Sequence, residues 1–258
     1  MQERRNRSGF LLLIFLYPFL LKSQGIANAE KFDQVWIGYF NQTRISNHWG
    51  TWLDLHVRTK DHFVDSFSQA ILRVGATYYA GERFRIMAGY AYVNQFPGDN
   101  HKNVSQPEHR GWQMLQWSSP GKSFRINQAI RLEEKFKHKI LNNDALAPGY
   151  GFYWKFRYGI SFNIPIKKVR VFKSALSFVV SDEIHLNFGK EITYHHFDQN
   201  RFFAGFSLNV NAKDNLQIGY MNQVQQSISN DYFKNVNVLR IFYFQQIDHR
   251  KSKSLLNK

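Results

Sequence analysis

The sequence predicts an all-β protein, a closed antiparallel up-and-down transmembrane β-barrel. Three observations predict this fold: long segments alternate between apolar and polar residues, the connections between them are alternately short and long, and the N-terminus has the features of an export signal. Alternate side chains of a strand point to opposite faces of a sheet. A segment with one apolar and one polar face therefore suits a barrel wall between lipid and a polar lumen.

The clearest of these segments is Gly151 to Asn163, with the sequence GFYWKFRYGISFN. Every second residue from Phe152 to Phe162 is bulky and apolar, whereas the positions between them include Lys155 and Arg157. In a water-soluble sheet, the apolar face would need a covering layer. In a membrane barrel it would face lipid, and the two cations would line the lumen.

Residues Met1 to Ala29 have the features of a signal peptide. A basic start is followed by an apolar core from Phe10 to Leu21 and by the small residues Ala27 and Ala29. The core has about 12 residues, which is too short to cross a bilayer as a helix. We expect export, cleavage after Ala29 and residence in the outer membrane of a Gram-negative bacterium; the alternative is an uncleaved anchor helix.

Composition excludes several classes of protein. The chain of 258 residues contains no cysteine, which excludes a disulfide scaffold, a thiolate metal site and a cysteine nucleophile. The mean hydropathy of −0.45 argues against a bundle of transmembrane helices. Although the formal net charge is +15, export argues against nucleic acid as a partner. We expect a monomer in contact with membrane lipid, with lipopolysaccharide as a further candidate partner.

Alternation with a period of two recurs along the rest of the chain. It predicts eleven segments, namely 32–43, 49–59, 68–79, 83–94, 109–117, 123–137, 151–163, 175–188, 201–211, 216–225 and 236–246. Membrane strands need about 9–11 residues, whereas strands of soluble proteins average about 5–6. The longer polar connections are 96–108, 138–149, 189–200 and 227–232, and a turn is expected around Pro165 to Arg170.

The eleven alternating segments make an odd number of strands. Single-chain bacterial barrels have even numbers of strands, so we favour twelve strands over the alternative of ten. A further strand would then lie within 63–79 or 189–200. The expected organisation is a signal peptide at 1–29, a barrel at 30–247 and a basic tail at 248–258.

Several local motifs resemble the DUF2490 family, which comprises uncharacterised outer-membrane β-barrel proteins of Gram-negative bacteria. They are Pro107-Glu-His-Arg110 with RLEEKF ending at Phe136, Trp36-x-Gly-Tyr39 before the Trp49 strand, Arg201-Phe-Phe-Ala-Gly205, and Gly219-Tyr-Met-Asn-Gln223. The resemblance extends over nearly the whole mature chain. It implies an outer-membrane barrel and supplies no catalytic residue. One departure from typical outer-membrane proteins is that a basic tail follows the last aromatic residue of the final strand, Phe244.

If the apolar faces point to lipid, charged side chains collect in the lumen. Buried charges must be paired or hydrated, so one interpretation is a lumen filled by salt bridges and water. Another is a cation-lined narrow channel or anion site, because the sign of the lining charges sets the selectivity of a pore. The charged candidates for the lumen lining are Arg73, Arg83, Arg85, Arg125, Arg131, Glu133, Lys155, Arg157, Glu183 and His185.

We assign no catalytic residue, metal or cofactor. Ser181 and His185 lie on the same face of one predicted strand, but the strand rise separates them by about 13 Å, too far for a nucleophile and its base. His195 and His196 with Asp198 match no defined metal-ligand spacing. We therefore predict a porin-like barrel of structural or narrow-channel type, and not an enzyme. The alternatives are a soluble periplasmic β-barrel that binds an apolar ligand, and an outer-membrane enzyme that modifies lipid.

Overall fold

The computed structural model describes residues 30–60, 62–98, 101–171, 174–190, 192, 196–226 and 233–250, with the backbone alone at 167–171 and 174. The predicted signal peptide and the last eight residues of the predicted tail lie outside these ranges. None of the described residues forms a helix long and apolar enough to cross a membrane. The strands are β1 (Glu30–Arg44), β2 (Trp49–Thr59), β3 (Phe67–Tyr79), β4 (Phe84–Gln95), β5 (Gln106–Pro120), β6 (Arg125–Ile140), β7 (Leu146–Val171), β8 (Ser174–Phe188), β9 (Phe197–Asn209), β10 (Asp214–Gln226) and β11 (Phe233–Asp248).

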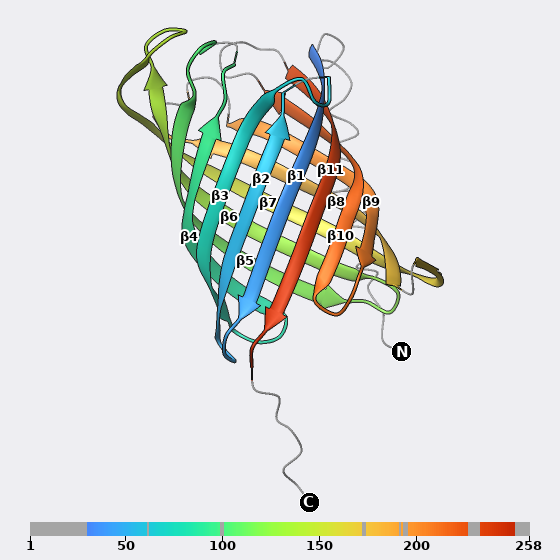
Figure 1. Cartoon of the computed structure of the whole chain (residues 1–258). Helices are drawn as coiled ribbons and strands as arrows, with labels where there is room; N and C mark the ends of the chain where they lie inside the picture. The colour runs from blue at the N-terminus through green and yellow to red at the C-terminus, as the bar shows by residue number, and fades with distance from the viewer. Residues whose placement is uncertain are drawn as a thin grey trace, which may run out of the picture.

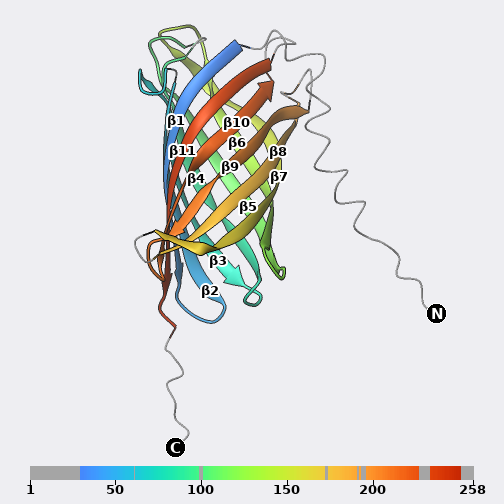
Figure 2. The same cartoon turned by 90° about the vertical axis from the view of Figure 1, so that its right-hand side faces the viewer.

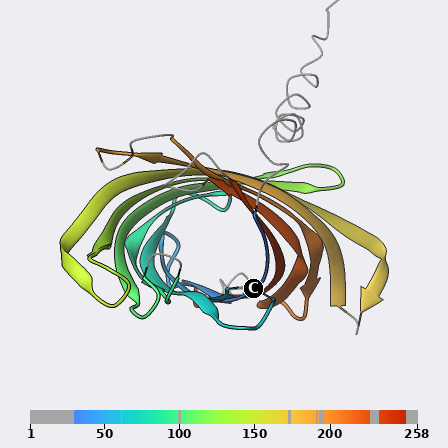
Figure 3. The same cartoon turned by 90° about the horizontal axis from the view of Figure 1, so that it is seen from above.

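These strands form one closed barrel (Figures 1 and 3). Each strand pairs in antiparallel fashion with its neighbours in the sequence, from β1–β2 to β10–β11. Closure comes from β1 and β11, which pair in parallel over their whole shared length, from Glu30 opposite Lys234 to Arg44 opposite Asp248. The predicted all-β closed barrel is therefore present.

The predicted number of strands is wrong, because the described residues form eleven strands and neither twelve nor ten. The prediction of a wholly antiparallel barrel is wrong for the same reason. When the strands alternate in direction, an odd number leaves the first and the last pointing the same way, so they must pair in parallel. Among the residues that the structure describes, neither suspected region supplies another strand, since Phe63 makes only an isolated bridge to Gln34 and β9 begins at Phe197.

Long and short connections lie at opposite ends of the barrel (Figure 2). Residues 60–66 and 96–105 join strands at the end where β1 begins, whereas the four-residue turns 45–48 and 80–83 lie at the other end. Both β1 and β11 run towards the short-turn end. The start of β1 and the end of β11 therefore lie at opposite ends of the barrel.

Several strands are longer than the sequence suggested. β2 has the predicted bounds, but β5 begins within the expected loop 96–108 and β9 begins within the expected loop 189–200. The turn expected around Pro165 is also wrong, because β7 continues to Val171. Pro165 pairs with Ser177, and the register then shifts before Arg170 pairs with Ala175. This irregularity accommodates the proline without ending the strand.

The two faces of the wall differ in polarity, as alternation requires. On β3, Leu72 and Val74 are 45% and 44% exposed on the outer face, whereas Arg73 between them is 4% exposed and points inward. Large apolar side chains are exposed on the other strands in the same way, among them Leu55, Ile86, Leu115, Phe206, Ile218 and Leu239. The exterior is thus apolar, and the interior holds the charged groups.

Ion pairs join the ends of β1 and β11 at the short-turn end. Glu82, in the turn between β3 and β4, accepts hydrogen bonds from Arg44 at 2.9 Å and from Arg250 at 3.1 Å. These two bonds lower the pKa of the Glu82 carboxyl. Arg250 also contacts Asp248 at 2.6 Å. The parallel pairing of β1 with β11, called the seam below, therefore ends in a cluster of charges. This cluster connects β1, the turn between β3 and β4, and the segment at the end of β11.

Candidate functional site: the charged lumen

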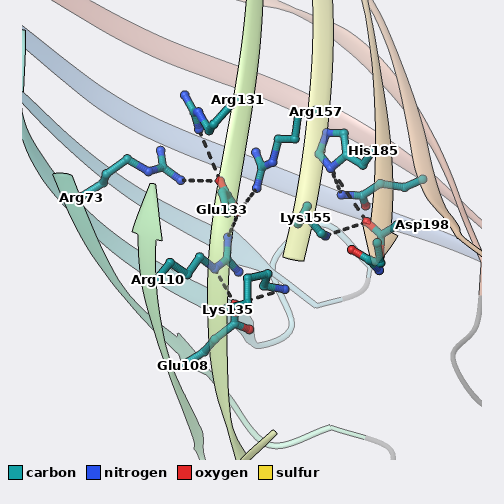
Figure 4. Close-up of polar contacts among 12 residues, drawn as sticks. Arg73, Glu108, Arg110, Arg131, Glu133, Lys135, Lys155, Arg157, His185 and Asp198 are labelled. Atoms are coloured by element: carbon teal, nitrogen blue, oxygen red, sulfur yellow. Dashed lines mark hydrogen bonds and ion pairs between the residues drawn. The ribbon is translucent and has the colours of Figure 1, made fainter. Parts of the chain in front are cut away.

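Glu133 lies at the centre of the charged lumen. Its carboxylate is fully buried and is surrounded by four arginines from four different strands (Figure 4). The nearest is Arg157 of β7, whose Nη2 lies 2.9 Å from Oε2. The other distances are 3.3 Å to Arg110, 3.7 Å to Arg131 and 3.9 Å to Arg73. One carboxylate cannot neutralise four guanidinium groups, so the network depends on further acids.

Glu108 and Asp54 supply two of these acids. Glu108 is fully buried on β5, where it contacts the guanidinium of Arg110 and lies 3.1 Å from Lys135 Nζ. Asp54 is equally buried on β2 and lies 2.7 Å from Arg73 Nη1. Arg73 and Arg110 each contact a second carboxylate as well as Glu133, so the pairs form one continuous network.

A second branch of the network crosses β7, β8 and β9. Lys155 donates to Asp198 at 2.6 Å, and Glu183 lies 3.7 Å from Arg157. His185 is fully buried between these two acids, with Nε2 3.0 Å from Glu183 and Nδ1 3.8 Å from Asp198. Seven strands, β2, β3 and β5–β9, therefore contribute charges to one connected cluster inside the barrel.

Because these charges are buried, the stability of the barrel depends on how completely they are paired. Removing an ion from water costs several kcal/mol even after relaxation, and the loss is recovered only where pairing and hydrogen bonding are nearly complete. The lumenal acids have two or more polar partners each: Asp198, for example, also accepts from Asn187 at 3.0 Å. The cluster therefore fixes the relative positions of the strands across the lumen, as well as filling it.

Eight of the ten charged residues proposed from the sequence point into the barrel: Arg73, Arg85, Arg131, Glu133, Lys155, Arg157, Glu183 and His185. Arg85 lies apart from the main network and donates to Gln116 at 3.0 Å. Arg83 lies in an exposed turn, and Arg125 is exposed at the start of β6. Arg83 and Arg125 thus lie at the rim of the barrel and not in the lumen.

Sequence reasoning missed several members of the network. Glu108 and Asp198 lie in segments that the sequence predicts to be loops, because strands β5 and β9 begin earlier than predicted. Arg110, Arg201 and Arg240 lie on predicted strands, and the alternation could have placed them on the inner face. Arg110 precedes the buried residues Trp112 and Met114 at spacings of two and four.

The groups considered for chemistry have other contacts. The ring nitrogens of His185 lie near Glu183 and near the amide of Gln199, at 3.0 Å and 2.7 Å. Asp198, considered for metal binding, is on β9 and binds Lys155, while His195 lies outside the described residues. The described residues contain no cluster of three or more metal-ligating side chains.

Comparison with known proteins identifies the family. The model of the DUF2490 family, described as a protein of unknown function, matches residues 33–234. The chain belongs to the DUF2490 family. This match confirms the resemblance drawn from the sequence motifs. No curated protein matches the chain. Among solved structures, a NanC porin in a rhombohedral crystal form is similar at 9% identity and a TM-score of 0.45, covering 78% of this chain and 94% of that chain.

Proposed function

We propose that this DUF2490 protein is an outer-membrane β-barrel of structural or narrow-channel type, with a lumen rich in Arg and Lys. The observation that carries the proposal is the difference in polarity between the outer and the inner face of the wall. Apolar side chains cover the outside of the closed barrel, and the charges lie inside. Contiguous exposed apolar surface of this extent is unusual on a soluble monomer and is typical of a surface that meets lipid or a partner.

Aromatic side chains support the membrane assignment. Trp49, Tyr78 and Phe84 are exposed near the short-turn end of the barrel. Tyr92 and Tyr150 are exposed near the long-loop end. Aromatic residues gather at the two interfaces of membrane barrels, because their rings suit the boundary between hydrocarbon and headgroups. Export through a signal peptide cleaved after Ala29 belongs to the same proposal.

The depth of burial favours a filled lumen over a wide pore. Asp54, Glu108 and Glu133 have no exposed surface, and Arg73 and Lys155 are 4% and 6% exposed. A narrow channel is the second candidate, since the cationic groups outnumber the acids near Glu133. Such a channel would favour anions.

The two rival functions fit these residues less well. A carrier of apolar ligands needs an apolar interior, whereas here charges from seven strands form one connected network inside the barrel. A lipid-modifying enzyme needs a nucleophile near its base, and His185 is instead held between Glu183 and Gln199.

Two measurements test the proposal. Fractionation of cells expressing the full chain should recover it in the outer membrane, with migration on gels that changes on heating; recovery in the soluble periplasm would contradict the proposal. In planar bilayers we expect either no conductance or small anion-selective steps. Large cation-selective steps would contradict a lumen that is both ion-paired and rich in Arg and Lys.

A further inference from the structure

A cavity of about 160 Å³ lies inside the barrel beside the ion-pair network. Six arginines line it, together with aromatic rings that include Trp36, Phe203 and Phe242. The arginines come from β2, β3, β6, β7, β9 and β11, namely Arg58, Arg73, Arg131, Arg157, Arg201 and Arg240. A single water needs only about 10–15 Å³ of such space, so the cavity has room for a small solute.

The charge around the cavity is unbalanced. Glu183 is the one carboxylate among its lining residues, and it lies 3.7 Å from Arg157 and 3.9 Å from Arg201. In the part of the chain that the structure describes, Arg58 and Arg240 have no carboxylate within ion-pair distance. The excess of positive charge is therefore greatest at these two guanidinium groups.

Aromatic stacking holds these two guanidinium groups, and Arg240 also donates a hydrogen bond to the side-chain oxygen of Gln217, but neither contact neutralises the charge. Arg58 lies over the indole of Trp36 at 3.7 Å, and Arg201 contacts the same indole at 4.9 Å. Arg240 lies over the ring of Phe203 at 3.3 Å. A cation–π contact recovers only a small part of the solvation free energy that a buried, unpaired ion loses. Stacking thus leaves a net cost that a bound anion would remove.

Hydrogen-bonding capacity is also left over. The buried Nε atoms of Arg58, Arg73, Arg157 and Arg240 have no acceptor among the described residues. Each guanidinium carries donors in a fixed planar fork that matches the oxygens of a carboxylate or phosphate. The cavity therefore combines unpaired positive charge with unused donors of the geometry that oxyanions need.

We propose that this cavity is a binding site for a small oxyanion, of the phosphate or carboxylate type, with Arg58 and Arg240 as its principal ligands. The surplus of cations excludes a metal ion, and the unpaired donors make the site unsuitable for an apolar ligand. The site rests on the charged lumen of the proposed function, and it does not depend on the location of the protein in the outer membrane.

Titration of the purified full-length protein in zwitterionic detergent tests the site, with sodium phosphate and sodium acetate as separate probes at constant ionic strength. We expect saturable calorimetric binding of at least one probe. Arg58→Gln and Arg240→Gln should each weaken it at least tenfold. Arg83→Gln and Arg125→Gln, which remove the same charge at the exposed rim, should leave it unchanged.

Thermal unfolding provides a second readout. In chloride alone, Arg240→Gln should unfold at an unchanged or higher temperature, because it removes an uncompensated buried charge. With phosphate or acetate present, the wild-type protein should gain stability and the variant should not. If a glutamine variant fails to fold, Arg58→Lys keeps the charge but loses the planar fork, and should still weaken binding.

Three outcomes would overturn the site. One is the absence of saturable binding of both probes to protein whose gel migration shows a folded barrel. Another is equal weakening by the rim and cavity variants, which would indicate general attraction to a basic protein. The third is binding that Arg58→Lys leaves unchanged. Recovery of the protein from the periplasm with binding intact would overturn the proposed location and leave the site standing.

Discussion

At the scale of single residues, Glu133 has the greatest influence on the lumen. Its fully buried carboxylate is the shared partner of Arg73, Arg110, Arg131 and Arg157. Deleting one partner of a buried ion pair leaves the other charge without compensation, which costs more than the pair itself contributes. Arg73, Arg110 and Arg157 each contact one further acid, so Glu133 is the carboxylate that joins all four arginines into one cluster.

We predict that Glu133→Gln destabilises the barrel by about 3–5 kcal/mol, because it removes a buried charge while keeping the size of the side chain. Denaturant unfolding in detergent, followed by heat-modifiable gel migration, measures the change. Glu134→Gln is the matched control, because Glu134 lies next in the chain on the outer face and contacts Gln113 at 3.4 Å. Equal stability of the two variants would show that the network contributes little.

Alternation along a strand assigns most charged residues to the correct face, because a strand has only two faces. It placed Arg73, Glu133, Lys155 and Arg157 inside. It could not indicate that four arginines converge on Glu133, because convergence depends on how strands far apart in the sequence meet across the barrel. Arg83 was misplaced because it lies one residue before β4 begins, where alternation no longer determines direction.

At the scale of the strands, pairs of glycines let aromatic rings pack closely against the inner wall. Gly75 of β3 pairs with Gly89 of β4, and the ring of Trp112 occupies the space that their side chains would take. Gly205 and Gly219 pair in the same way beside the ring of Phe203. Close approach of a ring to the backbone requires glycine at these positions.

Gly89→Ala should destabilise the protein by about 1–3 kcal/mol, since the added methyl overpacks the wall. A Cβ at Gly89 would lie 2.0 Å from the Val74 carbonyl oxygen and 2.9 Å from the Trp112 ring. Gly159→Ala is the control: its Cβ would lie 3.5 Å from the Glu183 side chain and 3.8 Å from the Asp182 carbonyl oxygen, both ordinary van der Waals distances. The midpoints of denaturant unfolding of the two variants measure the difference. An equal effect of both substitutions would argue against a requirement for glycine beside the Trp112 ring.

The stability that the Glu82 carboxylate contributes at the end of the seam should depend on pH. The pKa of its carboxyl is lowered by hydrogen bonds from Arg44 and Arg250, so the contacts contribute stability above the pKa of the unfolded chain. That contribution is lost as the pH falls through the lowered pKa of the folded state. Carboxyl NMR should show Glu82 titrating below an ordinary glutamate in wild-type protein, and closer to the ordinary range in Arg44→Gln. An unchanged titration in Arg44→Gln would contradict the contact.

At the scale of the whole molecule, closure of the barrel was predictable but its parity was not. Long alternating segments and connections of two lengths indicated a closed β-barrel. The general rule of even strand numbers then led to twelve strands, although the alternation itself showed eleven. The parallel pairing of β1 with β11 resolves the conflict, since fifteen paired positions join two strands that no local turn connects.

We expect the apolar exterior of the barrel to face lipid. The absence of natural cysteines allows single-cysteine labelling to test it. Leu72 and Val74 lie on the outer face of β3, and Lys122 lies in an exposed turn. The three variants are Leu72→Cys, Val74→Cys and Lys122→Cys.

The decisive measurement is fluorescence of a bimane label at these three positions in lipid vesicles, with quenchers attached to the acyl chains or dissolved in water. We predict that acyl-chain quenchers act on the labels at positions 72 and 74, and that the aqueous quencher acts on the label at 122. Strong aqueous quenching at 72 and 74, as at 122, would contradict a lipid-facing exterior.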